Sequence, residues 1–197
     1  MKKFNDYETT QSYKGSGEKL PAGGYVLRID NVRFEEGQNG NSDRIVLMFD
    51  VAEGDQKDFF RNQYDSQTSE DKKWKGTTQI YCPKDDGTEQ DGWTKRRFKT
   101  IMETFEASNK DYVWNWDESS LKGKFIGGLF GEIGTVIDGK DITYVGFRYF
   151  ETVENIRTNN FKVPEFYSKS GSVVKNTGSA TNDFMSIPKD AKEEIPF

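Results

Sequence analysis

Histidine is absent from this chain of 197 residues, and cysteine occurs once, as Cys82. Without histidine the chain cannot build a Ser-His-Asp or Cys-His catalytic group, an HExxH zinc site or a Cys/His zinc finger. A single cysteine excludes a disulfide within the chain and favours a reducing compartment. An enzyme built on this sequence would therefore have to use carboxylates, lysine, tyrosine or serine.

Long apolar segments are also missing. Hydrophobic residues make up 33% of the chain, and no apolar run approaches the roughly 20 residues that a membrane-spanning helix needs. Residues 1–6 lack the apolar segment of a signal peptide. The sequence therefore predicts no membrane contact and a cytoplasmic location.

Aromatic residues, in contrast, are abundant, at 14% of the chain with 15 Phe, 9 Tyr and 4 Trp. We expect a core with few residues but large side chains, among them Phe125, Phe130, Phe147 and Tyr149. The net charge is −5, whereas nucleic-acid-binding domains are usually basic. The charge is uneven, because residues 61–99 hold nine Lys/Arg against seven Asp/Glu, and residues 100–118 hold one against five.

Alternating apolar and polar residues predict five β-strands, over residues 25–33, 44–51, 77–82, 121–133 and 142–153. In the second strand Ile45, Leu47, Phe49 and Val51 should face the core, while Arg44, Val46, Met48 and Asp50 face away. Residues 58–61 are expected to pair back on this strand. Asp138-Gly139 predicts the tight turn of a hairpin between the last two strands.

One strong helix is predicted between the third and fourth strands. Phe98, Ile101, Met102 and Phe105 form a single apolar stripe, and Asp91 or Thr94 could cap the helix start. A helix at this place in a mainly β chain is typical of the five-stranded Greek-key barrel of the OB type. A β-sandwich is the alternative, but it needs about seven strands.

The sequence divides into three parts. Residues 1–19 read as a flexible N-terminal arm, residues 20–167 as the OB-type barrel, and residues 168–197 as a disordered linker and tail of small polar residues. Because an open edge strand can pair with a second copy, a homo-oligomer is compatible with this organisation.

The last five residues have the chemistry of a peptide ligand. Phe197 can fill an apolar pocket while its terminal carboxylate meets an arginine, and the two preceding acidic residues can approach a basic rim. This end resembles the C-terminal tip of bacterial single-stranded DNA-binding proteins, which implies recruitment of replication, recombination and repair proteins. The residues concerned are Glu193, Glu194, Ile195, Pro196 and Phe197.

A second resemblance covers roughly residues 20–165. Segments 83–99, 121–124, 154–157 and 161–164 are similar to a family of small phage and prophage proteins of Gram-positive bacteria, which sits among phage replication and recombination functions. The resemblance implies a protein that works in the cytoplasm of a bacterial host. It includes no catalytic motif.

Binding of single-stranded DNA needs cations along a groove and aromatic rings on which bases stack. In OB barrels the second and third strands and their loops form the usual binding face. We predict this role for residues on and around those strands: Arg28, Arg44, Arg61, Lys72, Lys73, Trp74, Lys75, Tyr81, Trp93, Arg96 and Arg97.

Two other functions remain open. Asp85, Asp86, Glu89 and Asp91 crowd one loop and could serve a carboxylate-dependent metal nuclease, although the spacing of a calcium EF-hand is not met. The aromatic content also fits a structural or carbohydrate-binding β-module. The sequence best supports a non-catalytic single-stranded DNA-binding protein without cofactor or metal.

Overall fold

The computed structural model describes residues 19–38 and 40–169, which form six strands and three α-helices. The mainly β class is confirmed. The described residues form three α-helices, whereas the sequence predicted one strong helix. The elements are β1 (Gly23–Glu35), β2 (Arg44–Val51), α1 (Phe59–Asp65), β3 (Thr77–Tyr81), α2 (Glu89–Ser108), the 3-10 helix η1 (Glu118–Leu121), β4 (Phe125–Ile137), β5 (Lys140–Glu151), α3 (Val153–Arg157) and β6 (Tyr167–Ser168).

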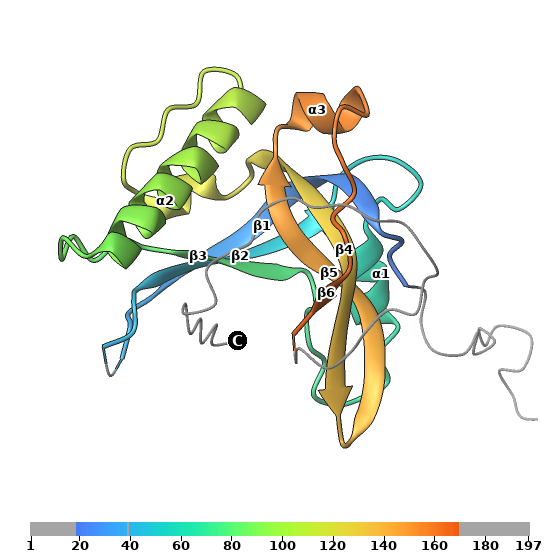
Figure 1. Ribbon diagram of the computed structural model, residues 1–197. Coiled ribbons are helices and arrows are strands. Elements are labelled where there is room, and N and C mark those ends of the chain that lie inside the picture. The colour runs from blue at the N-terminus through green and yellow to red at the C-terminus, as the bar shows by residue number, and fades with distance from the viewer. Residues whose placement is uncertain (1–18, 39, 170–197) are drawn as a thin grey trace, which may run out of the picture.

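The strands form one sheet in the order β3-β2-β1-β4-β5, with antiparallel neighbours, and β6 pairs with β4 in parallel. The expected closed barrel is wrong, because β3 and β5 stand at the two ends and no ladder joins them within the described residues. β3 has only five residues, all paired with β2, and Pro83, which has no N–H to donate, follows soon after it. Figure 1 shows the β4–β5 ribbon extending well beyond the other strands.

Helix α2 buries the predicted stripe of Phe98, Ile101, Met102 and Phe105. The helix begins at Glu89, earlier than expected, and its N-terminal cap is Thr88 and neither Asp91 nor Thr94. The hydroxyl of Thr88 accepts from the backbone N–H of Asp91 at 3.1 Å. Asp91 is itself buried and accepts from the backbone N–H of Lys84 at 2.8 Å, which ties the preceding loop to the helix.

Helix α1 replaces the strand expected over residues 58–61. Phe59 and Phe60 are both buried; neighbouring residues of a strand face opposite sides, whereas neighbours on a helix can share one. The helix start is held by a side chain from β2. The buried carboxylate of Asp50 accepts from the backbone N–H groups of Phe60 at 2.9 Å and Arg61 at 3.0 Å.

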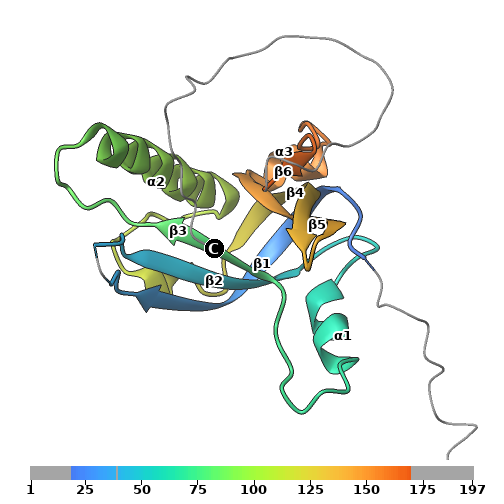
Figure 2. The same cartoon turned by 60° about the horizontal axis from the view of Figure 1, so that its bottom comes forward.

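The core lies on one side of the sheet, where Leu27, Ile29, Leu47 and Phe49 meet the buried stripe of α2. Figures 1 and 2 place α1 and α2 at opposite ends of β2 and β3. Within the described part of the chain, no helix is long and apolar enough to cross a membrane.

Two of the four expected core aromatics lie elsewhere. Phe130 is buried and Phe147 packs against the core, but Phe125 and Tyr149 are 38% and 51% exposed. The register of β4 and β5 shifts between Leu129 and Phe130, which pair with Tyr149 and Phe147, so that the residue between them is unpaired. This bulge explains why Tyr149 does not share the core-facing side with Phe147, two positions earlier.

Candidate nucleic-acid interface

Side chains at alternate positions of β1, β2 and β3 point away from the core and form one surface, which we call the outer face. Its orientation follows from the burial of the intervening Ile45, Leu47 and Ile80. The strand register arranges it in three rows, and the members of the rows are Glu35, Arg44 and Tyr81; Arg33, Val46 and Gln79; and Asn31, Met48 and Thr77.

A polar network crosses all three strands of the outer face. The Nε of Arg44 donates to Glu35 at 2.6 Å, and its Nη1 donates to Oε1 of Gln79 at 2.9 Å. Arg33 forms a second ion pair with Glu35. These hydrogen bonds, that with Arg44 foremost, hold the pKa of Glu35 below its usual range. Two arginines against one carboxylate leave the network with a positive charge.

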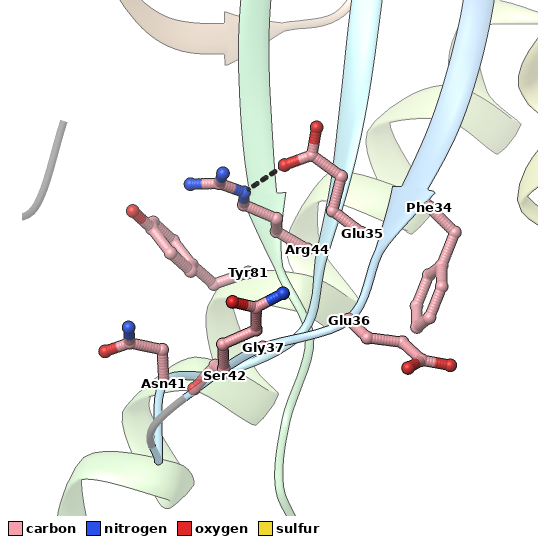
Figure 3. A pocket seen from close by; sticks show the side chains of 9 residues that line it. Phe34, Glu35, Glu36, Gly37, Asn41, Ser42, Arg44 and Tyr81 are labelled. Carbon is pink, nitrogen blue, oxygen red and sulfur yellow. Dashed lines mark hydrogen bonds and ion pairs between the residues drawn. The ribbon is translucent and has the colours of Figure 1, made fainter.

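A pocket of about 680 Å³ lies at one end of the outer face, between the β1–β2 loop and the end of β3. Figure 3 shows Tyr81 and Arg44 on one side of this pocket and Phe34 on the other. Glu35 and Glu36 line the same pocket, and Arg44 is paired with Glu35. A nucleotide bound here would stack its base on the Tyr81 ring and bring a phosphate to Arg44 in competition with Glu35.

At the opposite end of β2, helix α1 and the loop before β3 bring together two rings and two cations, the basic-aromatic loop. The rings of Tyr64 and Trp74 are 5.8 Å apart. The guanidinium of Arg61 lies 5.8 Å from the Trp74 ring, and the amino group of Lys72 lies 5.6 Å from the Tyr64 ring. Lys73 and Lys75 are exposed on the same loop.

Trp74 is held more firmly than its lysine neighbours suggest. Its indole N–H donates to the carbonyl oxygens of Phe49 at 3.2 Å and Gly76 at 3.1 Å, and the ring packs against the core. This geometry fixes the loop to β2 and leaves only part of the ring for a ligand. The exposed cations of this loop are therefore more accessible to a ligand than the Trp74 ring is.

The remaining predicted residues lie apart from these two clusters. Trp93 is 64% exposed, with the guanidinium of Arg96 at 4.5 Å from its ring. Helical spacing places both, with the exposed Arg97, on the side of α2 away from the buried stripe. Arg28 donates to Asp30 at 2.7 Å, a bond that raises the pKa of Arg28 and offsets its charge.

Gln79 and Tyr64 belong to these clusters but were not among the predicted residues. Gln79 could have been found, since it stands two positions before Tyr81 on the same strand face. Tyr64 stands in a polar segment without apolar periodicity, which offers no sign of a site. The five residues of the C-terminal tip lie outside the described residues.

The acidic loop before α2 is engaged in ion pairs. Lys95 pairs with Asp85 and with Asp91, the latter at 3.0 Å, and Asp86 accepts from the backbone N–H of Thr88 at 2.9 Å. Within the described ranges, no group of three Cys, Asp or Glu residues is arranged to hold a metal ion.

A scan of the chain against models of protein families finds no match, and no curated protein matches it.

Proposed function

We propose that this chain is a non-catalytic single-stranded DNA-binding protein of phage DNA replication and recombination, working in the cytoplasm of a bacterial host. The observation that carries the proposal is the outer face, where Tyr81 pairs with Arg44 across β2 and β3 and Arg44 borders the same pocket. Cations for the phosphates and a ring for the bases are the two requirements of single-strand binding.

The topology supports an OB-type sheet that is open between β3 and β5. β1 pairs with both β2 and β4, and the long helix α2 stands between β3 and β4, as in five-stranded Greek-key barrels of this type. In such barrels the second and third strands bind oligonucleotides. The outer face is built on these two strands together with β1.

The negative net charge does not oppose this assignment, because local potential decides where a phosphate chain binds. Arg33 and Arg44 face one carboxylate on the outer face, and Arg61 and Lys72 stand at the other end of β2. Residues 100–118 hold five Asp/Glu against one Lys/Arg, and residues 1–60 hold eleven against eight, with Glu35 and Glu36 at the outer-face pocket. We therefore expect modest affinity, with stacking contributing a large share.

Titration of a fluorescent oligo-dT with the full chain tests the proposal through its salt dependence. The logarithm of the binding constant falls with the logarithm of the salt concentration, with a slope of about −0.7 for each phosphate that a cation neutralises. If two to four of these cations contact phosphates, the slope should lie between roughly −1 and −3. The measurement is fluorescence anisotropy at increasing salt. No binding at low salt would contradict the proposal.

We further propose that the C-terminal tip recruits replication and recombination proteins. Deleting residues 193–197 is expected to leave the affinity for oligo-dT unchanged, because the cations and rings of the outer face are untouched. The same deletion should abolish capture of partner proteins from the bacterial host by the immobilised chain. Retention of those partners after the deletion would show that the tip is not the recruiting element.

A further inference from the structure

A second groove lies between α2 and the connector over residues 109–117, on the opposite side of the sheet from the outer face. Its volume is about 780 Å³. Phe34 and Ile45 contribute to it from β1 and β2; both belong to the strand positions that alternate with the outer face. Phe34 also borders the outer-face pocket, but Arg44 and Tyr81 do not line this groove, so a ligand here would leave both accessible.

One wall of this groove is an aromatic cluster. The rings of Phe98 and Trp116 are stacked, with centroids 6.2 Å apart and an interplanar angle of 16°, and Trp114 lies 6.1 Å from Phe98. Trp116 is 79% exposed. Its φ is +65°, a backbone conformation that residues other than glycine rarely adopt. Exposed apolar surface of this kind marks interaction sites, and strained residues gather at functional sites.

The charges around the groove are mainly negative. Four carboxylates line it against two lysines, and both lysines already form ion pairs, Lys95 with Asp85 and Lys99 with Glu103 at 3.6 Å. Glu118 has no cationic partner within the part of the chain that the structure describes. Cys82 also lines the groove. Burial is the main cause that raises the pKa of its thiol, and the negative charge of Glu118 raises it further. Such a surface repels phosphate and attracts cations.

We propose that this groove binds a basic segment of a partner protein, in which an apolar side chain is flanked by arginine or lysine. The apolar side chain packs on the cluster of Phe98, Trp114 and Trp116. The flanking cations meet Glu103 and Glu118, and a guanidinium can also lie over the exposed face of Trp116. Since the groove and the outer face lie on opposite sides of the sheet, the protein could hold DNA and this partner together.

The test uses the full chain and a short fluorescent peptide, capped at both ends, that alternates arginine and leucine. Fluorescence anisotropy should show binding that weakens at least tenfold on Trp116→Gly, because truncation of a central aromatic residue has effects of this size. Glycine is chosen because it adopts a φ of +65° without strain, so that the fold is kept. Trp93→Ala, which removes an exposed tryptophan outside the groove, should leave binding unchanged.

The electrostatic part is tested by two double variants with equal changes in net charge. Glu103→Gln with Glu118→Gln should weaken peptide binding at least fivefold. Glu89→Gln with Glu154→Gln, two exposed residues that do not line the groove, should leave it within a factor of two. Equal losses in both double variants would show a non-specific attraction and overturn the proposal.

Three further results would also overturn it: absence of peptide binding at millimolar concentration, equal binding of a peptide with glutamate in place of arginine, and unchanged binding on Trp116→Gly. The thiol of Cys82 gives an independent measurement, because a bound peptide should slow its modification by a thiol reagent. Protection by oligo-dT instead would identify the groove as a nucleic-acid site. The peptide outcomes do not depend on whether the outer face binds DNA, and protection of Cys82 by oligo-dT is therefore also measured in Tyr81→Ala, which removes stacking on the outer face.

Discussion

Replacing Tyr81 with alanine is expected to weaken binding of oligo-dT tenfold to a hundredfold while the fold is retained. Stacking of a base on an aromatic ring contributes about 1–3 kcal/mol, and each 1.4 kcal/mol is about a factor of ten in affinity. Tyr81 is the aromatic residue of the outer face, and its strand partner is Arg44. The measurement is fluorescence anisotropy at low salt, with thermal unfolding of the variant as the check on the fold.

Two control variants make this result specific. Tyr81→Phe keeps the ring and should stay within about threefold of the wild type, because stacking needs the π-face rather than the hydroxyl. Trp93→Ala removes the exposed ring on the far side of α2, and it should change affinity little if the outer face is the binding surface. A strong effect of Trp93→Ala together with no effect of Tyr81→Ala would move the interface to α2.

Replacing Asp50 with alanine is expected to lower the free energy of unfolding by on the order of 3 kcal/mol, because three buried or half-buried backbone N–H groups lose their acceptor. These are the N–H groups of Val51, Phe60 and Arg61. The N-cap residue of α1, Asp58, makes no side-chain hydrogen bond to the helix start. Asp58 therefore does not replace the hydrogen bonds that the Asp50 carboxylate provides. For a domain of this size the melting temperature should fall by roughly 6–12 °C.

Asp50→Asn is the matched control, since it keeps one acceptor oxygen and should lose about half as much stability. Burial is the main cause that raises the pKa of Asp50, against the opposing effect of its backbone hydrogen bonds. A raised pKa means that the folded state binds the proton more tightly, so stability is greatest below the ordinary carboxyl range and falls as pH rises through the raised pKa. The difference in the free energy of unfolding between the wild type and Asp50→Asn should therefore fall as the pH rises from the ordinary carboxyl range through the raised pKa of Asp50. A rise of this difference with pH would contradict a raised pKa for Asp50.

The elements that could be predicted are those specified by local patterns. The stripe of α2 and the alternation of β2 gave the correct buried faces, except at Asp50, which was expected to face away from the core. Asp50 is buried because its carboxylate holds the start of α1. The turn between β4 and β5 has positive φ at both Asp138 and Gly139, as the Asp-Gly pair predicts. Helix α1 could not be predicted this way, because its start is held by Asp50, a residue of the preceding strand.

The site was less predictable than the fold, because it depends on strand register and tertiary contacts. Alternation shows that Arg44 faces outward, but its position beside Tyr81 and Gln79 follows from the pairing of β2 with β3. Trp74 stands among lysines in the sequence, yet its indole N–H is bonded to backbone carbonyls. Trp116 is exposed and has a positive φ, and neither property follows from its place in the sequence.

Titration of single- and double-stranded oligonucleotides of equal length into the full chain, at one low salt concentration, tests the central claim most directly. The outer face offers a stacking ring and a limited set of cations, which suits unpaired bases and gives a duplex little beyond phosphate contacts. We predict at least tenfold tighter binding of the single strand, with most of this preference lost in Tyr81→Ala. Equal affinity for both forms, or a preference that Tyr81→Ala leaves intact, would contradict the assignment of the outer face as a single-strand-binding surface.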